Sequence, residues 1–257
     1  MNRRTFLVNS ASFLAGSLMG LNGVSKAFGF SGTEEKPLPR IAIIIDDIGY
    51  SRYKTRRFLS LGVPITFSIL PKLEKSRDLA DEIYAKGHEI MLHQPMEPHN
   101  GRLNPGPGAL YVGYEAKRIE EILDENLYTI PHALGVNNHM GSRLTECRGK
   151  MNEVLDVIED NSLFFVDSFT SSHSIAYKEA SRRHVPAAFR NIFLDNHRSE
   201  KYIIGQLRKL EGHAFKYGRA VGIGHPLPET AKALSRFFSG PGNPSDCLVH
   251  ISKVLKA

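Results

Sequence analysis

Side chains that can bind a metal ion or move a proton stand directly after short apolar runs of the sequence. They are Asp46, Asp47, His93, Asn138, His139, Asp167, Asp195 and His225. In parallel α/β folds the carboxyl ends of the strands meet at one edge, and active sites are built there. If the apolar runs are parallel strands, these side chains come together, and their chemistry points to a metal-dependent hydrolytic site.

Asp46 and Asp47 form an adjacent pair of carboxylates after the apolar residues 41–45. Neighbouring strand residues face opposite sides, but where a strand ends and the chain turns, both can reach one site. Two close carboxylates push their proton affinities apart unless a cation lies between them, which favours one metal ligand and one general base. The alternative is a cap for the following helix, which accounts for only one of the two aspartates.

Histidines supply the rest of the candidate site. A carboxylate and two neutral imidazoles form a hydrolytic zinc set that leaves one position open for water, and Asp47, His93 and His139 can supply it. His225 follows a glycine-containing apolar run and precedes Pro226, where it can protonate a leaving group. Each histidine could instead satisfy a buried neighbour, so the spacing alone leaves the metal site open.

The elements that must position these residues are short apolar runs separated by amphipathic segments. The runs are residues 40–46, 64–70, 88–92, 133–138, 163–167, 185–190 and 219–224, and the clearest helical segments are 73–85, 115–128, 151–160 and 201–217. This alternation predicts an α/β fold with a parallel sheet. No glycine-rich phosphate loop follows the first run, which argues against a dinucleotide fold. The strand count allows either a barrel or an open sheet.

The first 27 residues resemble a twin-arginine export signal. Arg3 and Arg4 precede a mildly apolar stretch, and small residues flank Lys26. Residues 28–39 are expected to be a linker and residues 40–257 one folded domain, located in the periplasm. No later stretch approaches the length of a membrane span, so we expect no stable span after signal cleavage.

Composition narrows the partners. The formal net charge of the 257 residues is +6, and removal of the leader lowers it to about +3. The remaining lysines and arginines are scattered, which argues against a nucleic-acid partner. Cys147 and Cys247 have no cysteine partner close in sequence, so no zinc knuckle is expected; a disulfide and two free thiols both stay open.

Six ordered motifs resemble the divergent polysaccharide deacetylase family. They are residues 45–50, 87–98, 137–142, 164–170, 193–196 and 223–226, within a match from about residue 40 to residue 238. The resemblance implies a distorted seven-stranded (β/α) barrel of the polysaccharide deacetylase type. It also implies a divalent metal ion, with zinc as the first candidate, and a glycan or peptidoglycan-like substrate.

The resemblance also implies roles for individual residues. Asp46 matches the general base, Asp47 and His93 match metal ligands, and His225 matches the general acid. Glu97 stands where the parent group has its second metal histidine, so either Glu97 or His139 completes the site. We favour His139, because Pro95 and Pro98 stiffen the loop around Glu97.

Other matched residues have supporting roles. Asp167 is assigned to the catalytic group, where it orients a neighbour or binds sugar hydroxyls. Asn138, Asp195 and Glu97 are expected to contact the substrate. The arginine–proline motif of the parent group is absent, and residues 137–140 stand in its place.

Two classes of function follow. The first is metal-dependent hydrolysis of an N- or O-acetyl group on an envelope or extracellular glycan. The second is a non-catalytic glycan-binding or envelope-assembly protein that keeps the deacetylase fold, because a fold does not guarantee its chemistry. The same metal site could also hydrolyse another bond, such as a peptide amide of the cell wall.

Overall fold

The computed structural model describes residues 38–240 and 243–256, which form one parallel sheet with helices around it. The strands are β1 (Arg40–Ile48), β2 (Thr66–Ile69), β3 (Glu89–Met96), β4 (Ala133–Met140), β5 (Phe164–Asp167), β6 (Ala187–Phe189), β7 (Ile192–Phe193), β8 (Arg219–Gly224) and β9 (Leu248–Val249). Their order is β6-β5-β4-β3-β2-β1-β8-β7, and β9 pairs with β1. The predicted export signal and nearly all of the predicted linker lie outside the described residues.

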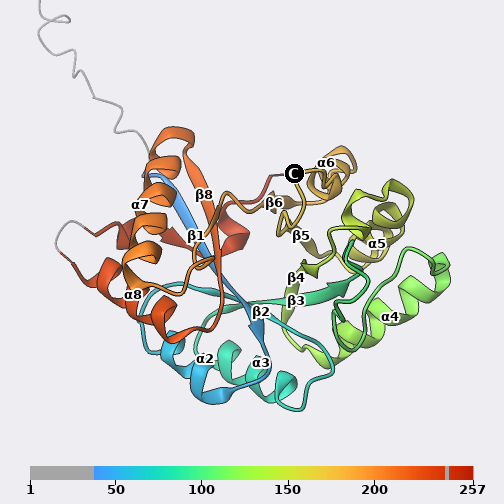
Figure 1. Ribbon diagram of the computed structural model, residues 1–257, viewed down its shortest axis with the longest axis horizontal. Helices are drawn as coiled ribbons and strands as arrows, with labels where there is room; N and C mark the ends of the chain where they lie inside the picture. The colour runs from blue at the N-terminus through green and yellow to red at the C-terminus, as the bar shows by residue number, and fades with distance from the viewer. Residues whose placement is uncertain (1–37, 241–242, 257) are drawn as a thin grey trace, which may run out of the picture. The chain divides into compact units, whose positions relative to one another are not determined.

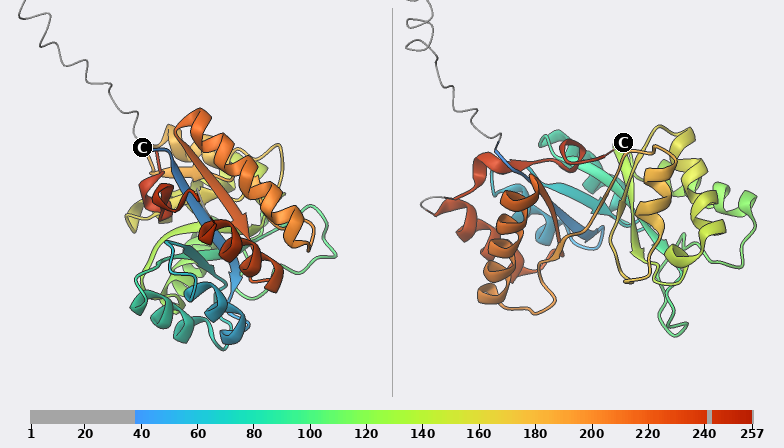
Figure 2. Two further views of the ribbon diagram at one scale, coloured as in Figure 1. Left: turned by 90° about the vertical axis from the view of Figure 1, so that its left-hand side faces the viewer. Right: turned by 90° about the horizontal axis from the view of Figure 1, so that it is seen from above.

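Helices follow the outside of this curved sheet (Figures 1 and 2). They are α2 (Arg52–Leu59), α3 (Ser76–Ala85), α4 (Ala116–Thr129), α5 (Arg148–Asp160), α6 (Ala176–Arg182), α7 (Glu200–Tyr217) and α8 (Pro228–Ser239). Helices α7 and α8 lie at one side, and α4, α5 and α6 lie at the other. None of these helices is long and apolar enough to cross a membrane. Cys147 and Cys247 are free thiols.

The predicted α/β architecture is confirmed, with two differences in detail. All seven expected strands are present, and the two-residue strands β7 and β9 are additional. The end strands β6 and β7 do not pair with each other within the described residues, so the barrel stays open there. The chain itself crosses this gap: Arg190 N–H donates to Asp167 O of β5, and Asn191 N–H donates to Val221 O of β8.

Side-chain alternation gives the sheet two different faces. On β1, Ile41, Ile43 and Ile45 belong to the large core under the helices, whereas Ala42 and Ile44 point to the inner face. The inner apolar cluster consists of Ala42, Ile44, Met91, Phe164, Val166, Ala188, Val221, Ile223, Ile251 and Val254. It fills the part of the inner face near the amino ends of the strands.

The C-terminal segment closes that end of the inner face. Ile251 and Val254 are buried in the inner cluster, and Ile251 N–H donates to Thr66 Oγ1 over 3.0 Å. Toward the carboxyl ends of the strands, the same face becomes polar, with Asp46 two residues beyond Ile44 and His93 two residues beyond Met91. The two-residue period therefore places the candidate chemistry directly above the apolar plug.

Close packing of β4 against β5 makes a direct test of this sheet. Gly135 pairs with Phe164, and a Cβ at Gly135 would lie 2.2 Å from the Phe164 ring. We predict that Gly135→Ala lowers the free energy of unfolding by about 1–3 kcal/mol, because the ring must shift in a packed sheet. The matched change Gly212→Ala in α7 meets nothing within 4 Å and should stabilise by up to about 1 kcal/mol. Urea unfolding measures both, and equal stabilities would contradict this account of the packing.

Candidate metal centre

Asp46 and Asp47 reach the same site because the backbone of β1 changes conformation between them. Asp46 continues the inner face of β1 and is 4% exposed. Asp47 has a left-handed φ of 57°, and the register of β1 against β2 shifts between Ile45 and Ile48. This conformation is uncommon for residues other than glycine, although aspartate tolerates it better than most, and it turns the Asp47 side chain toward the same site as Asp46. Neither aspartate caps α2, since the cap is the Ser51 side chain, which accepts from Lys54 N–H.

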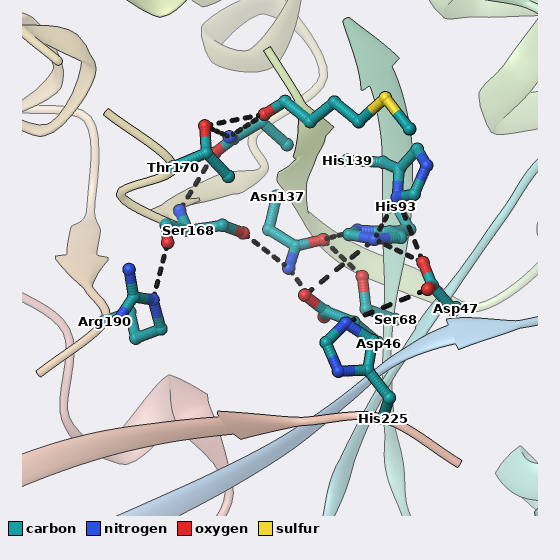
Figure 3. A network of polar contacts seen from close by, with 12 residues as sticks. Asp46, Asp47, Ser68, His93, Asn137, His139, Ser168, Thr170, Arg190 and His225 are labelled. Carbon is teal, nitrogen blue, oxygen red and sulfur yellow. Dashed lines mark hydrogen bonds and ion pairs between the residues drawn. The ribbon is translucent and has the colours of Figure 1, made fainter. Parts of the chain in front are cut away.

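Asp47, His93 and His139 converge on one point, from β1, β3 and β4 (Figure 3). His93 Nε2 lies 3.2 Å and His139 Nδ1 lies 3.0 Å from Asp47 Oδ1, and the two ring nitrogens are 3.1 Å apart. Around a tetrahedral zinc ion, ligand atoms at their usual bond lengths lie about 3.3 Å from one another. The three atoms therefore have the mutual spacing of ligands to one cation.

The polar environment of these atoms also fits a cation. Asp47 Oδ1 is buried, yet among the described residues it has no partner with the geometry of a hydrogen bond. Burial by itself raises the pKa of Asp47. The His139 and His93 rings have the larger combined effect, and they hold this pKa well below its ordinary value. Burial lowers the pKa of His93, but the Asp46 and Asp47 carboxylates raise it above its ordinary value. The site thus stabilises positive charge, as a divalent ion requires.

Asn137 joins this centre to Asp46. Its position opposite His93 in the β3–β4 register places the two side chains side by side on the inner face. The amide oxygen accepts from His93 Nδ1 at 2.7 Å and from the Ser68 hydroxyl. The amide nitrogen donates to Asp46 Oδ1 at 2.9 Å and to Ser168 Oγ at 3.2 Å. All four hydrogen-bonding positions of the amide are used.

This arrangement fixes the histidine and the carboxylate at the same time. Because the amide oxygen can only accept, His93 carries its proton on Nδ1, and its Nε2 lone pair points at the metal centre. Asp46 lies behind the centre, with Oδ2 3.8 Å from His93 Nε2. Burial raises the pKa of Asp46, and the nearby His93 and His225 charges and the Asn137 hydrogen bond offset part of that rise.

His225 lies just beyond the end of β8. Its Nε2 is 3.8 Å from Asp47 Oδ2, and its Nδ1 is 2.9 Å from Asp195 Oδ1. Asp195 also accepts from the His225 backbone N–H and from Thr230 Oγ1. Burial lowers the pKa of His225, but the hydrogen bond and charge of Asp195, with Asp46 and Asp47, raise it to about 9. This raised pKa favours the protonated form of His225, which can donate a proton.

Three residues expected at the site lie outside this cluster. Asn138 points to the opposite face of β4, where it accepts from Ser168 N–H and donates to Met140 O. Asp167 accepts from Phe169 N–H, the Ser174 hydroxyl and Tyr177 N–H, so its carboxylate organises the loop after β5.

Glu97 also lies outside the cluster, and its carboxylate holds two loops together. It accepts from Val112 N–H and from Arg143 Nη1, both at 2.7 Å, which ties the long glycine- and proline-containing loop to the turn after β4. The group of possible metal ligands among the described residues contains His139 and not Glu97. Of the two alternatives left by the sequence, the geometry therefore favours His139.

The sequence patterns did not identify four other residues of the network, which are Asn137, Ser68, Ser168 and Arg190. Arg190 donates to the backbone oxygen of Ser168 (Figure 3) and to that of Phe169. The signal for Asn137 was available, because it stands two residues before His139 and so shares its face. Ser68 and Ser168 could not be found in this way, because their role depends on the register of three strands.

The metal centre can be tested by metal content. We predict that Asp47→Ala and His139→Ala each abolish stoichiometric binding of a divalent ion, because each removes one of three protein ligands. Glu97→Gln should keep the metal, because an amide oxygen at this position can still accept from Val112 N–H. Mass spectrometry of the purified variants measures the result. Loss of metal in Glu97→Gln with retention in His139→Ala would reverse the assignment.

The role of Asn137 can be separated from general stability. We predict that Asn137→Leu weakens metal binding by roughly 10- to 100-fold, the usual effect of removing a group that orients a ligand. Asn138→Leu is the matched control, because this buried asparagine faces the other side of β4. Titration of the folded variants with zinc gives the affinity, and melting temperatures report stability separately. Equal affinities in the two variants would contradict the assigned role.

Comparison with known proteins places the chain in a family. A family model described as divergent polysaccharide deacetylase matches residues 43–255. The uncharacterized protein YibQ of Escherichia coli (strain K12) is 32% identical over 200 residues, which cover 77% of this chain and 61% of that protein. This chain therefore spans about three fifths of the length of that relative.

Solved structures agree with this match. The uncharacterized protein ATU2773 from Agrobacterium tumefaciens C58 has a TM-score of 0.79 and 25% identity, with coverage of 86% of this chain and 90% of that one. The catalytic domain of a peptidoglycan N-acetylglucosamine deacetylase from Eubacterium rectale has a TM-score of 0.50 and 14% identity, with coverage of 78% and 83%. At that identity the likeness concerns the fold alone. The match of the family model over most of the chain shows that this protein belongs to the divergent polysaccharide deacetylase family.

Proposed function

We propose that this protein is a metal-dependent carbohydrate deacetylase that acts on an acetylated glycan of the cell envelope. The observation that carries the proposal is that a buried carboxylate, Asp46, and an imidazole held by Asp195, His225, both lie within 3.8 Å of residues of one candidate metal centre. Hydrolysis of an acetyl group needs a base for the attacking water and an acid for the leaving group.

The residues divide this work between them. A divalent ion held by Asp47, His93 and His139 would supply Lewis acidity toward the acetyl carbonyl and lower the pKa of a water molecule. Asp46 accepts the proton of that water, and its raised pKa suits a base that must hold the proton. His225 donates its proton from Nε2 to the departing nitrogen or oxygen, while Asp195 holds Nδ1.

The proposal extends to the identity of the ion and the location of the protein. Zinc is the favoured ion, because a set of two imidazoles and one carboxylate is a known hydrolytic zinc site. Residues 1–27 would direct export to the periplasm by the twin-arginine route, residues 28–39 would be a linker, and residues 40–257 would be the working domain. This location would bring the site to the glycan or peptidoglycan-like substrate.

The base can be tested without disturbing the metal ligands. We predict that Asp46→Asn lowers acetate release from acetylated glycans by roughly 100- to 10,000-fold, because the amide cannot take the proton of the water. Zinc content should stay near that of the parent protein. Asp160→Asn removes the same charge from an exposed position at the end of α5 and should leave the rate unchanged.

The outcome of this test also decides between the two classes of function. No acetate release from acetylated chitooligosaccharides or peptidoglycan by the zinc-loaded parent protein would contradict the deacetylase proposal. If that protein still bound the same glycans, and Asp46→Asn bound them equally, the result would support a glycan-binding protein that keeps the fold.

A further inference from the structure

A pocket opens directly beside the candidate metal centre. It encloses about 370 Å³, and its walls include Asp47 and His225. This volume lies at the small end of the range of ligand sites. A group bound in this pocket would belong to the same substrate molecule as the group that reacts at the metal centre. The residues that line the pocket therefore influence which substrates bind.

Both acidic groups of the pocket already have a role within the site. Asp195 forms an ion pair with His225 and accepts from Thr230 Oγ1, and its side chain has no exposed surface. Asp47 belongs to the candidate metal centre with His93 and His139, where a bound divalent ion would neutralise its charge. Neither carboxylate is free to pair with a cation that enters with the substrate.

The basic groups of the pocket have no such partners. Lys54 projects from α2, and Arg198 lies in the segment before α7. Neither side chain forms an ion pair or a hydrogen bond within the part of the chain that the structure describes. Two other basic residues of α2 contrast with Lys54, because Arg52 and Arg56 both pair with Glu82 on α3.

The remaining walls suit a sugar. Tyr50 is 66% exposed, and it lines the pocket with Ser51 and Thr55. An exposed tyrosine ring offers a sugar an apolar surface with a polar tip. The Phe193 ring also lines the pocket, but it already contacts the Arg190 guanidinium, which lies 4.9 Å from the ring centroid.

We propose that this pocket binds an anionic group of the glycan, a carboxylate or a phosphate, through Lys54 and Arg198. The inference rests on the proposed function, and it narrows the substrate class from acetylated glycans in general to acidic ones. The acetylated residue lies at the metal centre, and the neighbouring acidic unit lies in the pocket next to Tyr50.

The test compares ligands of matched length by calorimetry with the zinc-loaded protein. The probes are a neutral tetramer of N-acetylglucosamine, a tetrasaccharide that alternates N-acetylglucosamine with glucuronic acid, and a short glycerol phosphate oligomer. We expect tighter binding of one acidic probe than of the neutral one. The preference should weaken when the salt concentration is raised from roughly 50 to roughly 300 mM, because salt screens the attraction between exposed charges.

The double variant Lys54→Gln/Arg198→Gln should lose the preference, with about tenfold weaker binding of the acidic probe and unchanged binding of the neutral one. Lys117→Gln/Lys178→Gln removes two exposed charges from α4 and α6 and should keep the preference. The carboxylate and phosphate arms identify the anion.

Failures of the two proposals are distinguishable. Acetate release from neutral glycans, with equal affinity for neutral and acidic probes, would overturn the charge preference and leave the deacetylase proposal standing. Preferential binding of acidic probes without acetate release from any glycan would support the charge preference and contradict the deacetylase proposal. A preference that survives in Lys54→Gln/Arg198→Gln would also overturn the inference.

Discussion

The amide of Asn137 connects the two functional halves of this protein. It accepts from His93 and donates to Asp46, so it orients a metal ligand and a buried carboxylate through one rigid group. Only a side chain with both a donor and an acceptor can do this, and an amide does so without adding charge. A carboxylate at the same place would repel Asp46, and an aliphatic side chain would leave both groups unpaired in a buried site.

This connection depends on the alternation of side chains in the parallel strands. Each inner position near the amino ends of the strands is apolar, and the next inner position toward the carboxyl ends is polar, as in Ile44 and Asp46 or Met91 and His93. The apolar plug excludes water from below and lowers the local dielectric, which strengthens the interactions above it. The same burial makes an unpaired atom costly, and Asp47 Oδ1 is such an atom unless a cation binds it.

Much of this structure could be predicted from the sequence, and the exceptions have physical reasons. The apolar runs gave the seven main strands, because buried parallel strands are continuously apolar. The convergence of Asp46, Asp47, His93, His139 and His225 followed from their places at strand ends. Asn138 and Asp167 were assigned to the site from the same positions, but their side chains face the other side of the sheet or its connecting loop.

Other features needed the structure because they depend on long-range register. The choice between Glu97 and His139 turns on which side chain can turn toward Asp47, and Glu97 is held by Val112 and Arg143 instead. The short strand β7 and the open edge of the barrel depend on how the chain crosses at Arg190 and Asn191. Local sequence patterns carry no information about such pairings.

The central claim is that one cation is bound by Asp47, His93 and His139. X-ray absorption at the zinc edge of the zinc-loaded protein tests it most directly. The account predicts two imidazole nitrogens and carboxylate or water oxygens at about 2.0–2.1 Å. A shell of oxygens without imidazole scattering, or a sulfur ligand at about 2.3 Å, would contradict it.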